Sequence, residues 1–211
     1  MKILVLGAGG HGRVVADILL RMREAGRDVE PVGYLDDDAS LHGKKFLGIR
    51  VLGPFDALPT VRHDAVVVAL GDNAVREKVF RRLDASGENF ITARHPCAVI
   101  PPDVSMGKGC MICAGVVVNT GTKIGDNTIL NTSASVDHDN IIGDHVHIAP
   151  GVVLGGDVIV GNGVLIGIGA TVMPRKTVNA KSVVGSGAVV CGNIPAGVLV
   201  SGIPAKEHKT S

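Results

Sequence analysis

A six-residue repeat fills the second half of the chain. From Ile124 to Ile159 the sequence reads IGDNTI LNTSAS VDHDNI IGDHVH IAPGVV LGGDVI, and the same register runs from Ile100 to Val190 without an insertion. The first residue of every unit is aliphatic or Met, and the second is frequently Gly. Six residues accommodate one short strand and one turn, which bury their apolar side chain only when neighbouring units stack. The period therefore predicts a parallel β-helix with the first positions pointing into a shared interior.

Three units per coil would form a triangular prism of roughly five coils, about 24 Å tall, because parallel strands lie about 4.8 Å apart. Glycine at the second position is expected at a corner that requires positive φ. A β-sandwich is the alternative, but its strands would show a two-residue alternation with turns at irregular spacing. Parallel connections are right-handed as a rule, so the spacing alone does not predict a left-handed helix.

Composition and charge exclude several classes of function. The chain has 211 residues with 21 Lys plus Arg against 20 Asp plus Glu, so no overall basic charge favours nucleic acid or an anionic membrane. With no Trp, one Tyr and four Phe, few rings are present on which bases could stack. No apolar run reaches the roughly 18 residues of a membrane helix, and no signal-peptide pattern opens the chain. We expect a soluble, cytoplasmic protein without nucleic-acid or membrane partners.

The first 92 residues predict a small Rossmann-like α/β domain with a parallel sheet. An apolar run at residues 2–6 leads into the turn GAGGHG at 7–12 and then into a helical pattern. We expect a second helix at 74–85 and further strands at 32–35, 46–52, 64–70 and 89–92. The carboxyl ends of parallel strands form the ligand-binding edge of such a sheet. This edge would carry the glycine turn, Asp36, Asp37 and Gly71.

The glycine turn matches G-x-G-x-x-G, in which the backbone approaches a phosphate at the start of a helix. An NAD-linked oxidoreductase is one interpretation of this fingerprint. The repeat that follows offers no obvious substrate domain for hydride transfer, and a single fingerprint is weak evidence. A phosphate-bearing ligand of another kind, such as a nucleotide sugar, fits the same loop.

Three of the eight histidines fall within ten residues of the repeat, at His138, His145 and His147. His138 lies between Asp137 and Asp139, and Asn140 places an amide at a fifth position, which is mostly small or β-branched in other units. An interruption of a regular solenoid indicates function. A histidine beside a carboxylate is suited to accept a proton near neutral pH, although a surface histidine at a corner would have the same pattern. His145 is interpreted as an ordinary turn residue.

Metal binding is a further alternative, since hexapeptide-repeat carbonic anhydrases hold zinc between subunits with histidines. A zinc site would leave the nucleotide-type domain unexplained. Cys110 and Cys113 form a lone C-x-x-C inside the repeat, whereas a zinc site of that type needs a second pair. We interpret both cysteines as packing residues and expect no metal.

Over its whole length the sequence resembles the bacterial sugar acyltransferases of the sialic acid O-acetyltransferase group, which include UDP-bacillosamine-type and GDP-perosamine-type 4-amino-sugar N-acetyltransferases. The matching pieces are GAGGHG at 7–12, LDD at 35–37, GDN at 71–73 with Arg76, LNTS at 130–133, His138-Asp139, IGD at 142–144 with His147, and GIPAK at 202–206. The resemblance implies a nucleotide-sugar-binding domain over 1–92 and a left-handed β-helix acyltransferase domain over 93–211. It also implies a homotrimer that binds acetyl-CoA between neighbouring β-helices.

The resemblance also implies roles for individual residues. It makes His138 the general base, Asp139 the acidic residue beside it and Asn131 a residue close to the reacting centre. Acetyl-CoA would be bound at His147, Ile168 and Ser186, and the nucleotide sugar at Gly9, Gly10, His11, Asp36, Asp37 and Gly71. The implied reaction is N-acetylation of a UDP- or GDP-linked 4-amino-4,6-dideoxy sugar for surface polysaccharide biosynthesis. Sialic acid-type O-acetylation and a non-catalytic oligomeric binding module are the alternatives.

Overall fold

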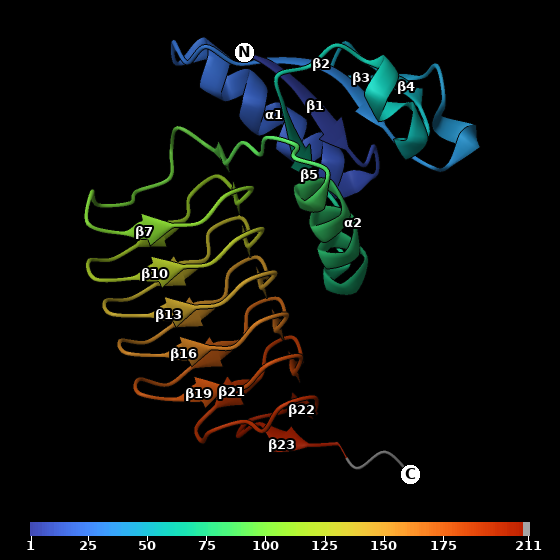
Figure 1. Cartoon of the computed structure of the whole chain (residues 1–211). Helices are drawn as coiled ribbons and strands as arrows, with labels where there is room; N and C mark the ends of the chain where they lie inside the picture. The colour runs from blue at the N-terminus through green and yellow to red at the C-terminus, as the bar shows by residue number, and fades with distance from the viewer. Residues whose placement is uncertain (209–211) are drawn as a thin grey trace. The chain divides into compact units, whose positions relative to one another are not determined.

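The computed structural model describes residues 1–208, which divide into two compact units. The first unit comprises Met1–Pro96 with Lys108–Met111, and the second comprises Cys97–Gly107 with the chain from Ile112 onward. Both long helices belong to the first unit, whereas the second is a stack of short strands (Figure 1). Within the described residues, no helix is long and apolar enough to cross a membrane.

The first unit is an α/β sheet with the strand order β3-β4-β2-β1-β5. Its strands are β1 (Lys2–Leu6), β2 (Glu30–Leu35), β3 (Lys45–Phe46), β4 (Ile49–Gly53) and β5 (Ala65–Val68), and β6 (Ala93–Arg94) lies outside this sheet. The helices are α1 (Gly10–Glu24) and α2 (Asn73–Ala85), with short 3-10 turns at Ala39–Leu41 and Phe55–Thr60. Strands β4, β2, β1 and β5 are parallel, which confirms the predicted class of this unit.

Two details of the predicted sheet are wrong. The expected strand at 46–52 is a hairpin, because Leu47 and Gly48 both have positive φ (52° and 78°) and reverse the chain between β3 and β4. A turn with two positive φ angles matches the twist of an antiparallel hairpin. The sheet is therefore mixed at one edge. The strand expected at 89–92 is reduced to a single bridge between Phe90 and Val66.

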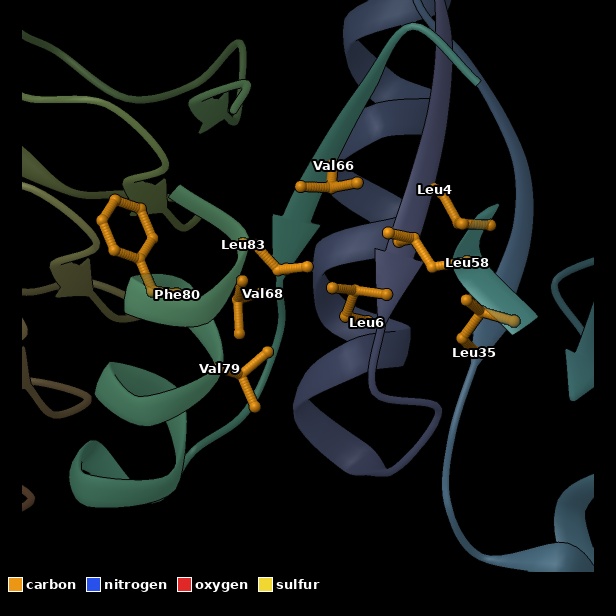
Figure 2. Close-up of a cluster of buried hydrophobic side chains, with 9 residues drawn as sticks. All are labelled: Leu4, Leu6, Leu35, Leu58, Val66, Val68, Val79, Phe80 and Leu83. Atoms are coloured by element: carbon orange, nitrogen blue, oxygen red, sulfur yellow. The ribbon is translucent and has the colours of Figure 1, made fainter. Parts of the chain in front are cut away.

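The core of the first unit joins the sheet to α2. Its buried side chains come from β1, β2, β5, the second 3-10 turn and α2, and Figure 2 shows them as Leu4, Leu6, Leu35, Leu58, Val66, Val68, Val79, Phe80 and Leu83. The buried residues of α2 recur at helical spacing, so one face of that helix covers the sheet. Asp72 begins α2 by accepting a hydrogen bond from the Val75 amide (2.8 Å). This cap fixes the loop that follows β5.

The second unit is a left-handed parallel β-helix of two-residue strands, as expected. One sheet holds β7 (Ser105–Met106), β10 (Lys123–Ile124), β13 (Ile141–Ile142), β16 (Ile159–Val160) and β19 (Thr177–Val178). A second holds β9 (Val117–Val118), β12 (Ser135–Val136), β15 (Val153–Leu154), β18 (Thr171–Val172) and β21 (Val189–Val190). The third includes β8 (Met111–Ile112), β11 (Ile129–Leu130), β14 (His147–Ile148), β17 (Leu165–Ile166), β20 (Val183–Val184), β22 (Leu199–Ser201) and β23 (Lys206–Glu207).

The register confirms three six-residue units per coil. Lys123 pairs with Ile141, so equivalent residues on successive coils are 141 − 123 = 18 positions apart. Figure 1 shows the resulting column of β7, β10, β13, β16 and β19. The first positions are buried in the shared interior, as at Ile148 and Ile166 (both 0% exposed).

The corners correct one expectation about glycine. Positive φ falls at the fourth position of the units, for example at Gly115 (72°), Asp139 (59°) and Lys181 (59°), and not at the second. The second-position glycines meet a different requirement. A Cβ on Gly143 would lie 2.2 Å from Asn162 Oδ1 and 2.9 Å from its backbone nitrogen, so the adjacent coil leaves no space for a side chain.

Candidate active site

The most distinctive corner of the β-helix consists of residues 137–140, between β12 and β13, and is called the His138 corner below. The Nδ1 atom of His138 lies 2.9 Å from Oδ2 of Asp139, and both side chains are more than half exposed. With Nδ1 carrying the proton of this hydrogen bond, Nε2 is the free basic nitrogen. The fourth-position Asp139, with its positive φ, therefore orients the imidazole that precedes it.

Three carboxylates make His138 more basic. The hydrogen bond to Asp139 is the main reason that the His138 pKa is raised above its usual value. The charge of Asp137 adds to this shift, and so does that of Asp157 on the next coil. Asp137 is itself fixed, because its Oδ1 accepts hydrogen bonds from the His138 amide (2.8 Å) and from Asn119 Nδ2 (2.9 Å).

The other predicted residues of the β-helix lie along a different edge, which is called the cofactor edge below. Asn131, Ile168 and Ser186 follow β11, β17 and β20, strands of one sheet, so they share one corner of the prism. His147 joins them, since its Nε2 lies 3.1 Å from Nδ2 of Asn131. Because 186 − 168 = 18, Ile168 and Ser186 stack on successive coils, and both are exposed. The structure thus brings these four together but places His138 and Asp139, which follow β12, at another corner.

Asn131 orients His147. The Oδ1 atom of Asn131 accepts a hydrogen bond from the Thr132 amide (2.8 Å), so its Nδ2 points to the imidazole and donates to Nε2. An accepting Nε2 leaves the proton of the neutral ring on Nδ1.

His145 differs from its interpretation as an ordinary turn residue. It occupies a fourth position with φ of 58° but is only 4% exposed, and its Nδ1 lies 2.9 Å from Nδ2 of the buried Asn127 one coil earlier. Nothing in the sequence pattern indicates this burial, because a fourth position is exposed at most other corners. Among the described residues, no group of three or more His, Cys, Asp or Glu is arranged to hold a metal ion.

In the first unit, the predicted nucleotide-sugar residues lie at the carboxyl ends of β1, β2 and β5. The loop after β1 is pinned to its neighbours, since the Gly7 amide donates to Leu35 O (2.7 Å) and the Ala8 amide donates to Asp36 Oδ2 (2.7 Å). The strand ends are also joined by the Ala69 amide, which donates to Leu6 O (2.8 Å). The loop therefore has a fixed shape that owes much to Asp36.

The glycines of this loop have separate roles. A Cβ on Gly12 would lie only 2.0 Å from Gly7 O, so Gly12 permits α1 to pack against the loop. Gly9, Gly10 and the more distant Gly71 have open space where a Cβ would project. Because α1 begins at Gly10, the positive end of its helix dipole lies at this loop, where it favours an anion.

Several polar residues near this edge have structural roles that the sequence did not indicate. Both oxygens of Asp36 accept backbone amides, from Ala8 and from Asp38 (2.9 Å), and Asp37 Oδ1 accepts the Phe55 amide (2.9 Å). The buried Arg76 of α2 donates to Leu70 O (3.2 Å), Gly71 O (3.4 Å) and Asn73 Oδ1 (2.8 Å). Burial lowers the pKa of Arg76 to about 10. Arg76 thereby shapes the loop that carries Gly71.

Comparison with known proteins identifies the same two-part arrangement elsewhere. The family model described as the PglD N-terminal domain matches residues 2–83. The GDP-perosamine N-acetyltransferase of Escherichia coli is 34% identical over 217 residues, which cover 98% of this chain and 96% of that protein. A UDP-N-acetylbacillosamine N-acetyltransferase of Bacillus subtilis is 34% identical over 119 residues, covering 54% of this chain and 51% of that protein.

Solved structures agree with these relatives. PerB from Caulobacter crescentus, in complex with CoA and GDP-perosamine, is 37% identical with a TM-score of 0.90, covering 99% of this chain and 98% of that chain. Two variants of the perosamine N-acetyltransferase from that organism, with a histidine replaced by Asn or Ala, have been solved with the same ligands. The acetyltransferase domain of PglB from Neisseria gonorrhoeae, with acetyl coenzyme A, is 34% identical with a TM-score of 0.92 and covers 98% of each chain.

A parallel α/β unit followed by a β-helix of six-residue repeats, with an exposed histidine hydrogen-bonded to a carboxylate, is the arrangement of a hexapeptide-repeat acyltransferase. More narrowly, the chain belongs to the family of acetyl-CoA-dependent sugar acetyltransferases that contains the GDP-perosamine and UDP-N-acetylbacillosamine N-acetyltransferases. The family resemblance drawn from the sequence is confirmed. The roles of individual residues stay predictions.

Proposed function

We propose that this protein transfers the acetyl group of acetyl-CoA to the 4-amino group of a nucleotide-linked 4-amino-4,6-dideoxy sugar, with His138 as the general base. The observation that carries the proposal is the hydrogen bond between His138 Nδ1 and Asp139 at an exposed corner of the β-helix (2.9 Å). The named activities of the relatives in Escherichia coli and Caulobacter crescentus support the choice of an amino sugar as acceptor.

The reaction needs a single transfer with no covalent enzyme intermediate. His138 Nε2 accepts a proton from the sugar amine as its nitrogen forms a bond to the thioester carbonyl carbon. The tetrahedral oxyanion then collapses, the C–S bond breaks, and the CoA thiolate recovers a proton from the imidazolium. Orientation of the two substrates can contribute about 7–11 kcal/mol, and general base catalysis contributes about a hundred- to ten-thousandfold.

We further propose that the active assembly is a homotrimer with acetyl-CoA bound along the cofactor edge, between neighbouring β-helices. The His138 corner and the cofactor edge lie at different corners of one prism, so the apposition of two copies would supply both to one reaction. Exposed apolar side chains on the outer strands offer a surface for such packing, as at Val117, Ile141, Val153 and Ile159.

The first unit would hold the nucleotide. Gly9, Gly10 and Gly71 leave the backbone accessible, and the start of α1 suits the diphosphate. His11, Asp36 and Asp37 are the polar side chains that we place around the ribose and base. Because their backbone hydrogen bonds leave further lone pairs on Asp36 and Asp37, the carboxylates can still accept hydrogen bonds from hydroxyls or from a base.

The testing experiment is thiol release from acetyl-CoA against UDP- and GDP-linked 4-amino-4,6-dideoxy sugars, free sialic acid and CMP-sialic acid. We expect CoA release with one nucleotide-linked amino sugar, which also identifies the base. Release only with a sialic acid would replace N-acetylation by O-acetylation. No CoA release with any of these compounds, together with no stabilisation by acetyl-CoA in thermal melting, would favour a non-catalytic binding module.

His138→Ala tests the general base directly. We expect turnover to fall by at least about a hundredfold, because the amine loses its proton acceptor. Binding of the nucleotide sugar and of acetyl-CoA, measured by calorimetry, should change little, since the side chain is more than half exposed. Normal turnover in this variant would remove His138 from the role.

A further inference from the structure

A buried asparagine holds the backbone of the His138 corner from inside the β-helix. Asn140 is fully buried, and its Nδ2 lies 2.7 Å from Asp137 O, 3.2 Å from His138 O and 3.0 Å from Gly155 O on the next coil. Three surrounding carbonyls identify this end of the side chain as the amide nitrogen. The side chain thus connects two carbonyls of the corner to the coil that follows.

Asn140 is not the residue that would make this interior position most stable. In the same column, the fifth position one coil later is Val158, which is also fully buried. The Oδ1 atom of Asn140 is buried and accepts no hydrogen bond from the residues that the structure describes. An unsatisfied buried oxygen lowers stability, so an aliphatic residue would suit this interior better. Thr122, one coil earlier, adds a second interior donor to the same corner, since its Oγ1 lies 3.1 Å from Asp137 O.

The imidazole of His138 lies against a glycine of the next coil, Gly156. A Cβ on Gly156, eighteen positions later (156 − 138 = 18), would lie 2.5 Å from His138 Nε2 and 2.7 Å from Cε1. Gly156 is not among the residues with positive φ, so its backbone would accept alanine without strain. What requires glycine at this position is the space that the ring occupies.

We propose that Asn140 and Gly156 are positioning residues for His138, with Asn140 fixing the backbone of the corner and Gly156 leaving the space in which the imidazole lies. This inference rests on the proposed function of His138 as general base. Together with Asp139 on Nδ1, the two residues define both the place and the orientation of Nε2. A displacement of about 1 Å in a reacting group can reduce rates by a hundredfold.

Kinetics of two variants test the proposal. For Gly156→Ala we expect a fall in kcat of about a hundredfold, and for Asn140→Val about tenfold, with both KM values within about twofold of wild type. The melting temperature should be nearly unchanged in Gly156→Ala and should not fall in Asn140→Val. Asn140→Thr restores one donor, as Thr122 provides in the same column, and should recover part of the lost kcat.

Ser182→Ala is the matched control. Ser182 is also a fully buried fifth position, and its Oγ donates to the carbonyl of the residue three before it, Asn179 (2.5 Å), as Asn140 does to Asp137. It lies at a corner without a predicted catalytic residue. We expect Ser182→Ala to lower the melting temperature while kcat stays unchanged.

A readout independent of turnover is the NMR titration of the His138 imidazole. In wild type its pKa should lie above the usual value, and in both variants it should return toward that value, because a displaced ring loses its hydrogen bond to Asp139. If both variants keep the wild-type kcat and the wild-type pKa of His138 while His138→Ala is inactive, the positioning role is overturned and the general base stays intact. Full activity of His138→Ala would overturn the proposed function and this inference with it.

Discussion

The two units place their polar site residues in opposite ways. In the first unit, Asp36, Asp37 and Arg76 hydrogen-bond the backbone of the loops that would bind the ligand, so the side chains that shape these loops also maintain the fold. In the β-helix, His138 and Asp139 project from a scaffold whose strands are held by backbone hydrogen bonds and aliphatic side chains. Variants of these three loop-bonding residues should therefore change binding and stability together, whereas variants of the exposed pair should change only the reaction.

The largest effect that this contrast predicts is at Gly12. Its absent Cβ would lie 2.0 Å from Gly7 O, and a backbone atom cannot move aside as a flexible side chain can. We expect Gly12→Ala to lower the free energy of unfolding by about 3 kcal/mol, at the upper end of the usual cost of overpacking. Chemical denaturation followed by circular dichroism measures this change.

Gly10→Ala is the matched variant, because Gly10 opens the same helix but would present a Cβ to open space, with no neighbouring atom within 4 Å. Alanine restricts the unfolded chain, so stability should rise by a few tenths of a kcal/mol or stay unchanged. The KM for the nucleotide sugar should increase, since a methyl group would stand where a diphosphate approaches. Equal stability losses in the two variants would refute the separation of structural and ligand-facing glycines.

Asp36 is predicted to affect both properties at once. Asp36→Ala removes the acceptor of the buried Ala8 amide, which costs about 1–3 kcal/mol when left unsatisfied. Because the glycine loop loses its anchor, we expect the KM for the nucleotide sugar to rise about tenfold, a change that corresponds to about 1.4 kcal/mol of binding free energy. Steady-state kinetics and thermal melting provide the two readouts.

Asp38→Ala is the control for this prediction. Asp38 directly follows Asp36 and Asp37 in the sequence, but it is exposed and its carboxylate hydrogen-bonds the nearby Ser40. Both KM and melting temperature should stay close to wild type. A KM increase in Asp38→Ala equal to that in Asp36→Ala would indicate a general effect of charge, not the anchoring of the loop.

The fold was largely predictable because its signals are periodic. Six-residue spacing from Ile100 to Val190 determined the coils, and the glycine turn with its flanking strand and helix located the ligand edge of the sheet. The hairpin between β3 and β4 was not predicted, because Leu47 has a positive φ that leucine rarely adopts. The reason for the second-position glycines escaped as well, since close contact between coils is a property of the stacked structure.

Site residues were predictable to the extent that they interrupt a pattern. Asn140 stands out because other fifth positions are mostly small or β-branched, and His138 stands out because it lies between two aspartates near that residue. The burial of His145, in contrast, follows from packing that the spacing does not encode. Gly156 carried no signal, because glycine is common in the repeat and its significance depends on a ring eighteen residues away. The structural roles of Asp36 and Asp37 could not be predicted either, because the amides that they accept, those of Ala8 and Phe55, are distant in sequence.

The smallest change in rate is expected for Asp139→Asn, which tests the exposed pair of the β-helix. Asp139→Asn keeps the size of the side chain but weakens the main interaction that raises the pKa of His138. A general base acts in its neutral form, so activity falls as the pH drops below that pKa. Because the variant lowers the His138 pKa, the acidic limb of the kcat/KM profile should move to lower pH, with a moderate loss of rate from the weaker base.

Stability in the same variant provides the decisive comparison with Asp36. A histidine whose folded-state pKa is raised stabilises the fold below its unfolded pKa, and this contribution is lost as the pH rises through the raised value. Asp139→Asn should reduce that pH dependence of the melting temperature, yet leave the melting temperature near pH 8 unchanged, because both side chains are more than half exposed. A large loss of stability at pH 8 would show that the exposed pair maintains the fold as Asp36 does, and the contrast between the two units would fail.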